Sequence, residues 1–289
     1  MKIETSKTIP AFYFDSGQLS RLVESSRKNF TQAQPFPHIV FDDFLPSPVA
    51  SLLAAEFPGP DDIDWTLWGP GEIKHTKDKQ IEKLGTSDET KFGPFTRHLM
   101  AQLNSAVFLE FLEKLTGVPS LIADPYFNGG GLHSTGRGGK LLVHADASRH
   151  PVRCFHQRLN LILFLNQDWE EEYGGHLELW SRDKKRCEKK ILPIFNRCVL
   201  FDTGAHSYHG QPAPLTCPPD RRRNSLAVYY YVLDRQQDEH YDGFRDYVDW
   251  VPSRPEDKPS IGFYRFKIFV KRFLPPFLVK SIKRILKEK

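Results

Sequence analysis

Cysteine is scarce in this chain, and its spacing does not suggest a zinc site or a disulfide framework. The 289 residues include only Cys154, Cys187, Cys198 and Cys217. No two of them form a C-x-x-C pair, which excludes a zinc ribbon or a thioredoxin-like motif. A chain of this length with so few cysteines is also not a disulfide-stapled scaffold. We therefore expect the cysteines to be reduced and structural.

Long apolar runs are absent as well. None approaches the roughly 20 residues that a membrane-spanning helix needs, and the first ten residues lack the basic-then-apolar order of a signal peptide. We therefore expect a cytoplasmic protein. Hydrophobic residues make up 39% and charged residues 26% of the chain, values that exclude a mainly disordered protein. The length is sufficient to bury a sizeable core.

The net charge of +4 hides an uneven distribution. Residues 258–289 contain ten lysines or arginines and a single acid, Glu288, whereas the rest of the chain has 30 basic and 35 acidic residues. The tail is also rich in aromatics at 262–274, and Leu278, Ile282 and Ile285 follow at helical spacing. This pattern predicts a basic helical tail that contacts an anionic membrane surface through residues 262–289, or one that packs on the body. Nucleic-acid binding is disfavoured.

Composition divides the chain into three parts. Residues 1–118 predict a helical support for the rest of the chain. Helices are expected at 18–29, after an N-cap at Ser47, and over 94–116. A short strand is expected at 37–41 and a polar loop or lid at 59–92. Residues 119–235 contain many short β-rich runs bounded by Gly, Pro, Asn and Asp. Residues 236–289 form a C-terminal extension. Helices followed by many short strands indicate an α+β fold with a β-sandwich or jelly-roll core.

His144 and Asp146 end one of these strands after a glycine-rich turn. Residues two apart in a strand point to the same side, so this pair presents a nitrogen and a carboxylate oxygen together. Two such ligands and a third from elsewhere form the open face that suits non-haem Fe(II). An H-x-D pair alone is weak evidence, because about one is expected by chance at ordinary composition. His240 and Asp242 form a second pair, which we interpret as surface, and His176 with Glu178 is a third, weaker alternative.

Two downstream segments support the interpretation of His144 and Asp146 as metal ligands. His209 is followed by Gly210 and ends a strand, as expected where the backbone closely approaches a site. The strand that starts at Arg223 places Arg223, Ser225 and Ala227 on one face. The guanidinium of Arg223 supplies a permanent charge and a planar fork that matches a carboxylate.

The order H-x-D, Gly-Gly-x-Leu, His and R-x-S resembles the iron(II)/2-oxoglutarate-dependent oxygenases of the prolyl-4-hydroxylase-like branch. The resemblance covers about 120–233 and includes the segments 158–169, 174–180, 192–201 and 223–231. It implies a double-stranded β-helix (jelly roll, cupin-like) core. It also implies the iron ligands, His144, Asp146 and His209, with His206 as the competitor for the third position.

The resemblance implies that Arg223 pairs with the distal carboxylate of 2-oxoglutarate and that Ser225 assists it. Arg221 and Arg222 are the alternatives to Arg223. Some relatives have a tyrosine where this chain has Phe164, so a second donor is expected from Asn160 or Tyr126.

The implied reaction is hydroxylation of an unactivated C–H bond, with decarboxylation of 2-oxoglutarate to succinate. It uses Fe(II), 2-oxoglutarate and O₂, with ascorbate as a candidate reductant. A small molecule or saccharide is the favoured substrate. The alternatives are a protein (prolyl-type) hydroxylase that acts on a partner protein, and a non-catalytic jelly-roll binding module.

Overall fold

The computed structural model describes residues 12–65, 79–150, 153, 155–233 and 247–273. Their helices are α1 (Ser16–Gln32), α2 (Ser47–Ala55), α4 (Pro94–Leu103), α5 (Ala106–Thr116) and α6 (Lys258–Phe273). Short 3₁₀ turns are η1 (Glu89–Lys91), η2 (Glu171–Tyr173) and η3 (Pro255–Asp257). The strands are β1 (His38–Phe41), β2 (Gln80–Thr86), β3 (Ile122–Ala123), β4 (Gly131–Ala145), β5 (His156–Phe164), β6 (Leu177–Trp180), β7 (Cys187–Ile191), β8 (Arg197–Asp202), β9 (His209–Gln211), β10 (Arg223–Val232) and β11 (Asp249–Trp250). In this part of the chain no helix is long and apolar enough to cross a bilayer.

The strands form one curled antiparallel sheet. Their hydrogen-bonded order is β1-β8-β5-β10-β4-β9-β6-β7, and β2, β3 and β11 add to its sides. The long strand β4 pairs with β10 over residues 131–135 and with β9 over residues 141–144, so it carries the sheet from one layer to the other. This confirms the α+β class with a double-stranded β-helix core.

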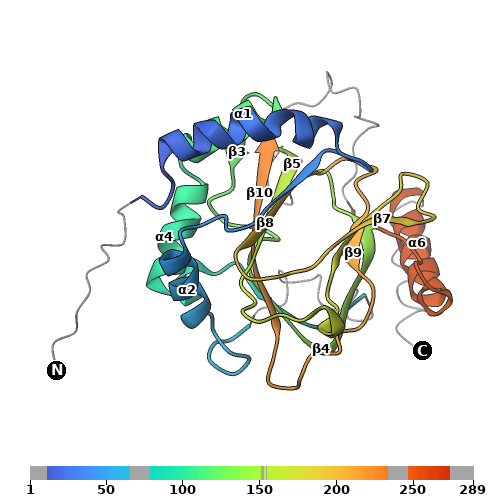
Figure 1. Cartoon of the computed structure of the whole chain (residues 1–289). Coiled ribbons are helices and arrows are strands. Elements are labelled where there is room, and N and C mark those ends of the chain that lie inside the picture. Colours follow the sequence, from blue (N-terminus) through green and yellow to red (C-terminus); the bar gives the residue numbers. More distant parts are fainter. Residues whose placement is uncertain (1–11, 66–78, 151–152, 154, 234–246, 274–289) are drawn as a thin grey trace.

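The two faces of the β5–β8–β10 layer have different partners. Leu161, Leu200 and Val228 point outward into a core shared with the helices, for example with Leu99 and Phe108. Figure 1 shows α1, α2 and α4 on this side of the sheet. The opposite face carries Phe164, Val199 and Phe201, which pack against Leu177 and Leu179 of β6 inside the roll. Alternation along each strand thus separates a helix-facing core from an inner face that is available for a site.

Several boundaries differ from the expectations. The apolar stripe over 94–116 is divided between two helices, α4 and α5, because Ser105 caps the second helix by accepting a bond from the Phe108 N–H at 3.4 Å. Ser47 is the first residue of α2, and Pro46 is the N-cap, so the predicted cap is wrong by one position. The short β-rich runs on either side of the glycines at 136–139 join into the single strand β4.

The polar segment 59–92 is not only a loop. Residues 80–86 form β2, which pairs with β4 and moves Lys83 from an expected solvated loop into the sheet. The rest of the predicted lid includes residues 66–78, which lie outside the described residues. Helix α6 covers the first part of the basic tail and packs on Leu142 and Trp250 through Ile261. The helix expected around 278–286 also lies outside the described residues.

Candidate active site

Three of the predicted ligands meet inside the roll. Asp146 follows the end of β4, and His144 and His209 are directly opposed on β4 and β9. One ligand atom from each residue lies within 4.8 Å of the others. The His144 Nε2 is 3.4 Å from Asp146 Oδ1, and the His209 Nε2 is 3.9 Å from Asp146 Oδ2. The sequence pattern therefore leads to one compact cluster in the structure.

Backbone carbonyls fix the orientation of both imidazoles. His144 Nδ1 is 2.8 Å from the Leu142 carbonyl oxygen, and His209 Nδ1 is 3.0 Å from that of Ser207. Because a carbonyl only accepts, each Nδ1 carries a proton, and each Nε2 faces Asp146. This second contact is the usual way in which proteins orient histidine ligands.

The charge states also suit a cation. Burial, together with the neighbouring His144, lowers the pKa of His209 to about 4, although Asp146 opposes the shift. Burial opposes ionisation of Asp146, but His209, His144 and a hydrogen bond from Gln157 hold the pKa of its carboxyl below the usual value. At neutral pH the site therefore presents neutral His209 and an ionised carboxylate, as metal binding requires.

Close packing holds the two strands in this register. A Cβ on Gly210 would lie only 2.8 Å from the Cα of Val143, so only glycine allows β9 to approach β4 this closely. The His144 ring lies 4.8 Å from the Trp250 ring, and the His209 ring lies 4.8 Å from the Phe201 ring. Both histidines are nearly inaccessible, with 7% and 4% exposed. The donors are therefore preorganised for a small cation.

Arg223 enters the same interior face from β10. Its Nε donates to the Gly175 carbonyl oxygen at 2.7 Å, and its guanidinium lies 4.7 Å from the centre of the Phe164 ring. Gly175 has a φ of +77°, and a Cβ there would lie 3.0 Å from the Arg223 side chain. Burial lowers the pKa of Arg223 to about 10. The described residues supply no carboxylate to this guanidinium, so it is available to an anionic ligand.

The competing residues make other contacts. Arg221 donates to the Gln167 carbonyl oxygen at 2.9 Å, whereas Arg222 donates to the Ser134 hydroxyl at 2.8 Å. His206 is not part of the three-residue cluster. His176 lies 3.4 Å from the exposed Glu171. The pair at 240 and 242 lies outside the described residues.

The three expected helpers of Arg223 are placed differently. Ser225 is buried two residues along β10, opposite Phe164. Asn160 lies opposite Tyr229 and hydrogen-bonds its hydroxyl, and this tyrosine senses the charge of Asp146. Asn160 is therefore closer to the metal ligands than to Arg223. Only Ser225 is brought beside Arg223.

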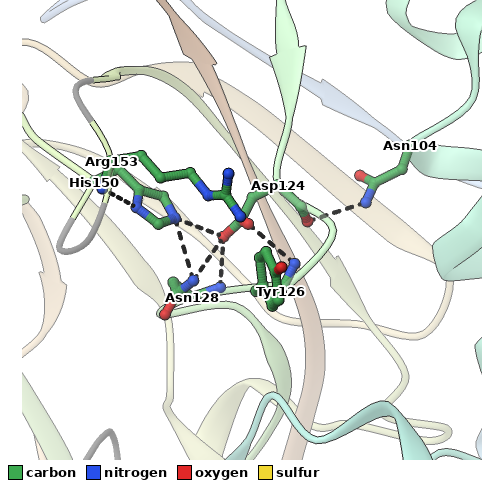
Figure 2. A network of polar contacts seen from close by, with 6 residues as sticks. All are labelled: Asn104, Asp124, Tyr126, Asn128, His150 and Arg153. Atoms are coloured by element: carbon green, nitrogen blue, oxygen red, sulfur yellow. Dashed lines mark hydrogen bonds and ion pairs between the residues drawn. The ribbon is translucent and has the colours of Figure 1, made fainter.

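Tyr126 belongs to a separate cluster (Figure 2). Asp124 accepts from the backbone N–H groups of Tyr126 and Asn128 at 3.0 and 2.8 Å, and it pairs with His150 at 3.3 Å. The Tyr126 ring is 59% exposed and lies 4.8 Å from the Arg153 guanidinium.

The loop of Tyr126 follows β3, whose Ala123 pairs with Tyr230. Tyr230 is seven residues, roughly 23 Å, along β10 from Arg223. The structure thus does not bring Tyr126 to the Arg223 end of the strand.

Two residues near Arg223 were not anticipated, Lys83 and His133. His133 is opposite Ser225 on β4, and burial beside Lys83 and Arg223 lowers the pKa of its imidazole well below the usual value. Alternation along 132–135 could have placed His133 on the same face as Thr135. Lys83 lacked such a signal, because the polar sequence around β2 is typical of a loop.

A jelly roll that holds two histidines and one carboxylate on an open face is the arrangement of the non-haem Fe(II) oxygenases. Comparison with known families agrees. Residues 130–231 match the model of the 2OG-Fe(II) oxygenase superfamily. The expected resemblance to the 2-oxoglutarate-dependent oxygenases is confirmed for this segment. The family implies Fe(II) and 2-oxoglutarate, and the donor set described above fits both.

One protein with a similar sequence is a prolyl 3-hydroxylase. The chain is 28% identical over 79 residues to mouse (Mus musculus) prolyl 3-hydroxylase OGFOD1, a match that covers 26% of this chain and 14% of the length of that relative.

The fold is similar to that of a Trichoplax adhaerens prolyl hydroxylase solved with a peptide fragment of the hypoxia inducible factor oxygen degradation domain. That match has a TM-score of 0.55 and 16% identity, and it covers 75% of this chain and 94% of the other. A Pseudomonas putida prolyl-4-hydroxylase gives a TM-score of 0.51 and 16% identity, with 73% and 100% covered. These two likenesses concern the fold.

Proposed function

We propose that this protein hydroxylates an unactivated C–H bond with Fe(II), 2-oxoglutarate and O₂. One oxygen atom enters the substrate as the hydroxyl group and the other enters succinate, while 2-oxoglutarate loses CO₂. The observation that carries the proposal is the position of Arg223 on the same interior face as the cluster of His144, Asp146 and His209.

Each residue has a distinct role in this proposal. His144, Asp146 and His209 would hold Fe(II), which supplies activation of O₂ when it is bound. Arg223 would pair with a carboxylate of 2-oxoglutarate, and Ser225 would add a hydroxyl donor. The buried aromatic walls, Phe201 and Trp250, exclude water around the histidines. The protein thus contributes orientation, charge neutralisation and protection. Ascorbate is the reductant that we would add to keep the iron reduced.

An anaerobic titration tests this function. Purified protein would receive Fe(II) and then 2-oxoglutarate, and the visible metal-to-ligand charge-transfer band would be followed. We expect the band in wild type, its loss in His144→Ala and its weakening in Arg223→Ala, with Arg221→Ala as the matched control. A folded protein with excess iron and no band would instead support the non-catalytic binding module.

The substrate class is a separate part of the proposal. A small molecule or saccharide remains our first prediction, and a protein substrate is the second candidate, which the OGFOD1 match favours. Peptides that contain proline and a panel of saccharides would be incubated with the loaded enzyme and examined by mass spectrometry. A gain of one oxygen atom on a peptide but on no saccharide would identify a protein hydroxylase, and the reverse result would exclude it.

A further inference from the structure

Lys83 lies in the same cross-strand row as Arg223. On β4, Thr135 pairs with Arg223 of β10 on one side and with Lys83 of β2 on the other. Residues directly opposed in a sheet point to the same face, so the three side chains form one row on the interior face. The next row along this face contains Ser225, His133 and Gly85, and Gly85 adds no side chain above the row.

The charges in this row are close enough to sense one another. Burial, with Arg223 as the next largest cause, lowers the pKa of Lys83 to about 7, and Asp146 acts in the opposite direction. Lys83 therefore lies within range of both the guanidinium and the metal-binding carboxylate. His133 is influenced by both Lys83 and Arg223, which places the two cations around the same small region.

Lys83 and Arg223 are half-buried cations on the two strands that flank β4, and an anion bound between them removes the cost of their repulsion. Asp146 also acts on Lys83, and its carboxylate belongs to the metal cluster. A dicarboxylate that reaches from the metal ligands to Arg223 would pass alongside Lys83. Phe164 lies opposite Ser225 and offers no hydroxyl to such a ligand, so a donor in addition to Arg223 and Ser225 would come from a neighbouring strand.

We propose that Lys83 is the second cationic donor to the distal carboxylate of 2-oxoglutarate, which it shares with Arg223. This inference rests on the proposed function and names a residue that the sequence pattern did not suggest. An ammonium on β2 and a guanidinium on β10 then hold one carboxylate from opposite sides of β4. Binding of 2-oxoglutarate would therefore stabilise the pairing of β2 with the sheet.

Isothermal titration of the Mn(II)-loaded protein tests the proposal without turnover. The probes are 2-oxoglutarate and 2-oxopentanoate, which has the same carbon chain without the distal carboxylate. We expect Lys83→Met to weaken 2-oxoglutarate binding by about tenfold to a hundredfold, the range for a lost charge-assisted bond. Binding of 2-oxopentanoate should be unchanged. Lys185→Met, at a lysine whose side chain is 80% exposed, is the matched control.

The outcomes separate this inference from the proposed function. An unchanged 2-oxoglutarate affinity in Lys83→Met, or an equal loss for both probes, overturns the role of Lys83 and leaves the function intact. A wild-type protein that binds Mn(II) but neither probe overturns the proposed function and the inference with it. Lys83→Gln serves as a second variant if Lys83→Met does not fold, and circular dichroism would confirm folding in each case.

Discussion

His144 and His209 occupy directly opposed positions on β4 and β9, and their ring centres are 4.5 Å apart. Neither strand alone brings two imidazoles together. Their meeting depends on the register between the strands, which shifts between Leu141 and His144. The site is therefore a product of the sheet as a whole, and its chemistry is sensitive to changes in that register.

The first prediction concerns the third ligand. His209→Ala should lose tight Mn(II) binding, as should His144→Ala, because each removes one of three clustered donors. His206→Ala should bind Mn(II) as wild type does, because His206 lies outside the cluster. Electron paramagnetic resonance of free Mn(II) would measure the affinities. Loss of binding in His206→Ala with retention in His209→Ala would show that the third ligand has been wrongly assigned.

A second prediction concerns Gln157, which holds Asp146 in place. Its Nε2 donates to Asp146 Oδ2 at 3.0 Å. Gln157→Leu keeps the approximate size of the side chain but removes the donor, and it should weaken Mn(II) binding by about tenfold, as other losses of such contacts do. Calorimetric titration with Mn(II) would measure this.

Gln167→Leu is the control for that experiment, because Gln167 is exposed and lies away from the cluster. The melting temperature of the metal-free protein would be recorded for each variant. An effect on metal affinity without a comparable effect on melting identifies Gln157 as a positioning residue. Equal metal affinities in the wild-type and Gln157→Leu proteins would contradict the prediction.

How much of the site could be anticipated depends on how local its signals are. His144 and Asp146 lie two residues apart on the chain, and Arg223 and Ser225 likewise, so strand alternation alone places each pair on one face. Lys83 reaches the same face only through the pairing of β2 with β4. That pairing is non-local, and the polar residues of β2 carry no strand pattern that would reveal it.

The fold follows the same rule. The short β-rich runs were visible because turn residues bound them, and the apolar stripes indicated helices. The break between α4 and α5 was hidden, because the apolar stripe continues across Asn104 and Ser105 while the backbone does not. Tyr126 lies away from Arg223 for a related reason. Its distance from Arg223 follows from the pairing of β3 with the far end of β10. This pairing is non-local, so the residues around Tyr126 do not predict it.

A third prediction uses the lowered pKa of Lys83 in the protein without metal or 2-oxoglutarate. Between the folded pKa of about 7 and the ordinary value of 10.5, the unfolded chain binds more protons at this lysine than the folded chain does. The free energy of unfolding should therefore rise with pH through this interval. Lys83→Met removes that contribution. The rise from pH 7 to pH 9 should be larger in wild type than in the variant.

Urea denaturation at the two pH values, in the presence of a chelator, would measure this difference. Groups that lie away from Lys83 titrate equally in both proteins, so their contributions cancel. Lys185→Met should follow wild type, because its side chain is 80% exposed. Parallel changes in wild type and Lys83→Met would mean that the Lys83 ammonium is solvated in the free protein.

The last prediction concerns the hydrogen bonds that connect the helical layer to the sheet. Asn196 is 1% exposed and has a φ of 58°. Its side chain accepts from the Leu45 N–H at 3.0 Å and donates to the Leu45 carbonyl oxygen at 2.8 Å. Asn196→Ala would leave both buried backbone groups without a partner and keep a side chain in the left-handed region. It should cost roughly 2–4 kcal/mol of unfolding free energy.

Urea denaturation would measure this cost as a lower midpoint at an unchanged slope. Asn29→Ala, on the exposed face of α1, is the matched control and should stay within about 0.5 kcal/mol of wild type. A loss of less than about 1 kcal/mol in Asn196→Ala would show that water replaces the side chain at Leu45. A loss in the expected range would show that this asparagine anchors the segment before α2, and with it the helical layer, to the start of β8.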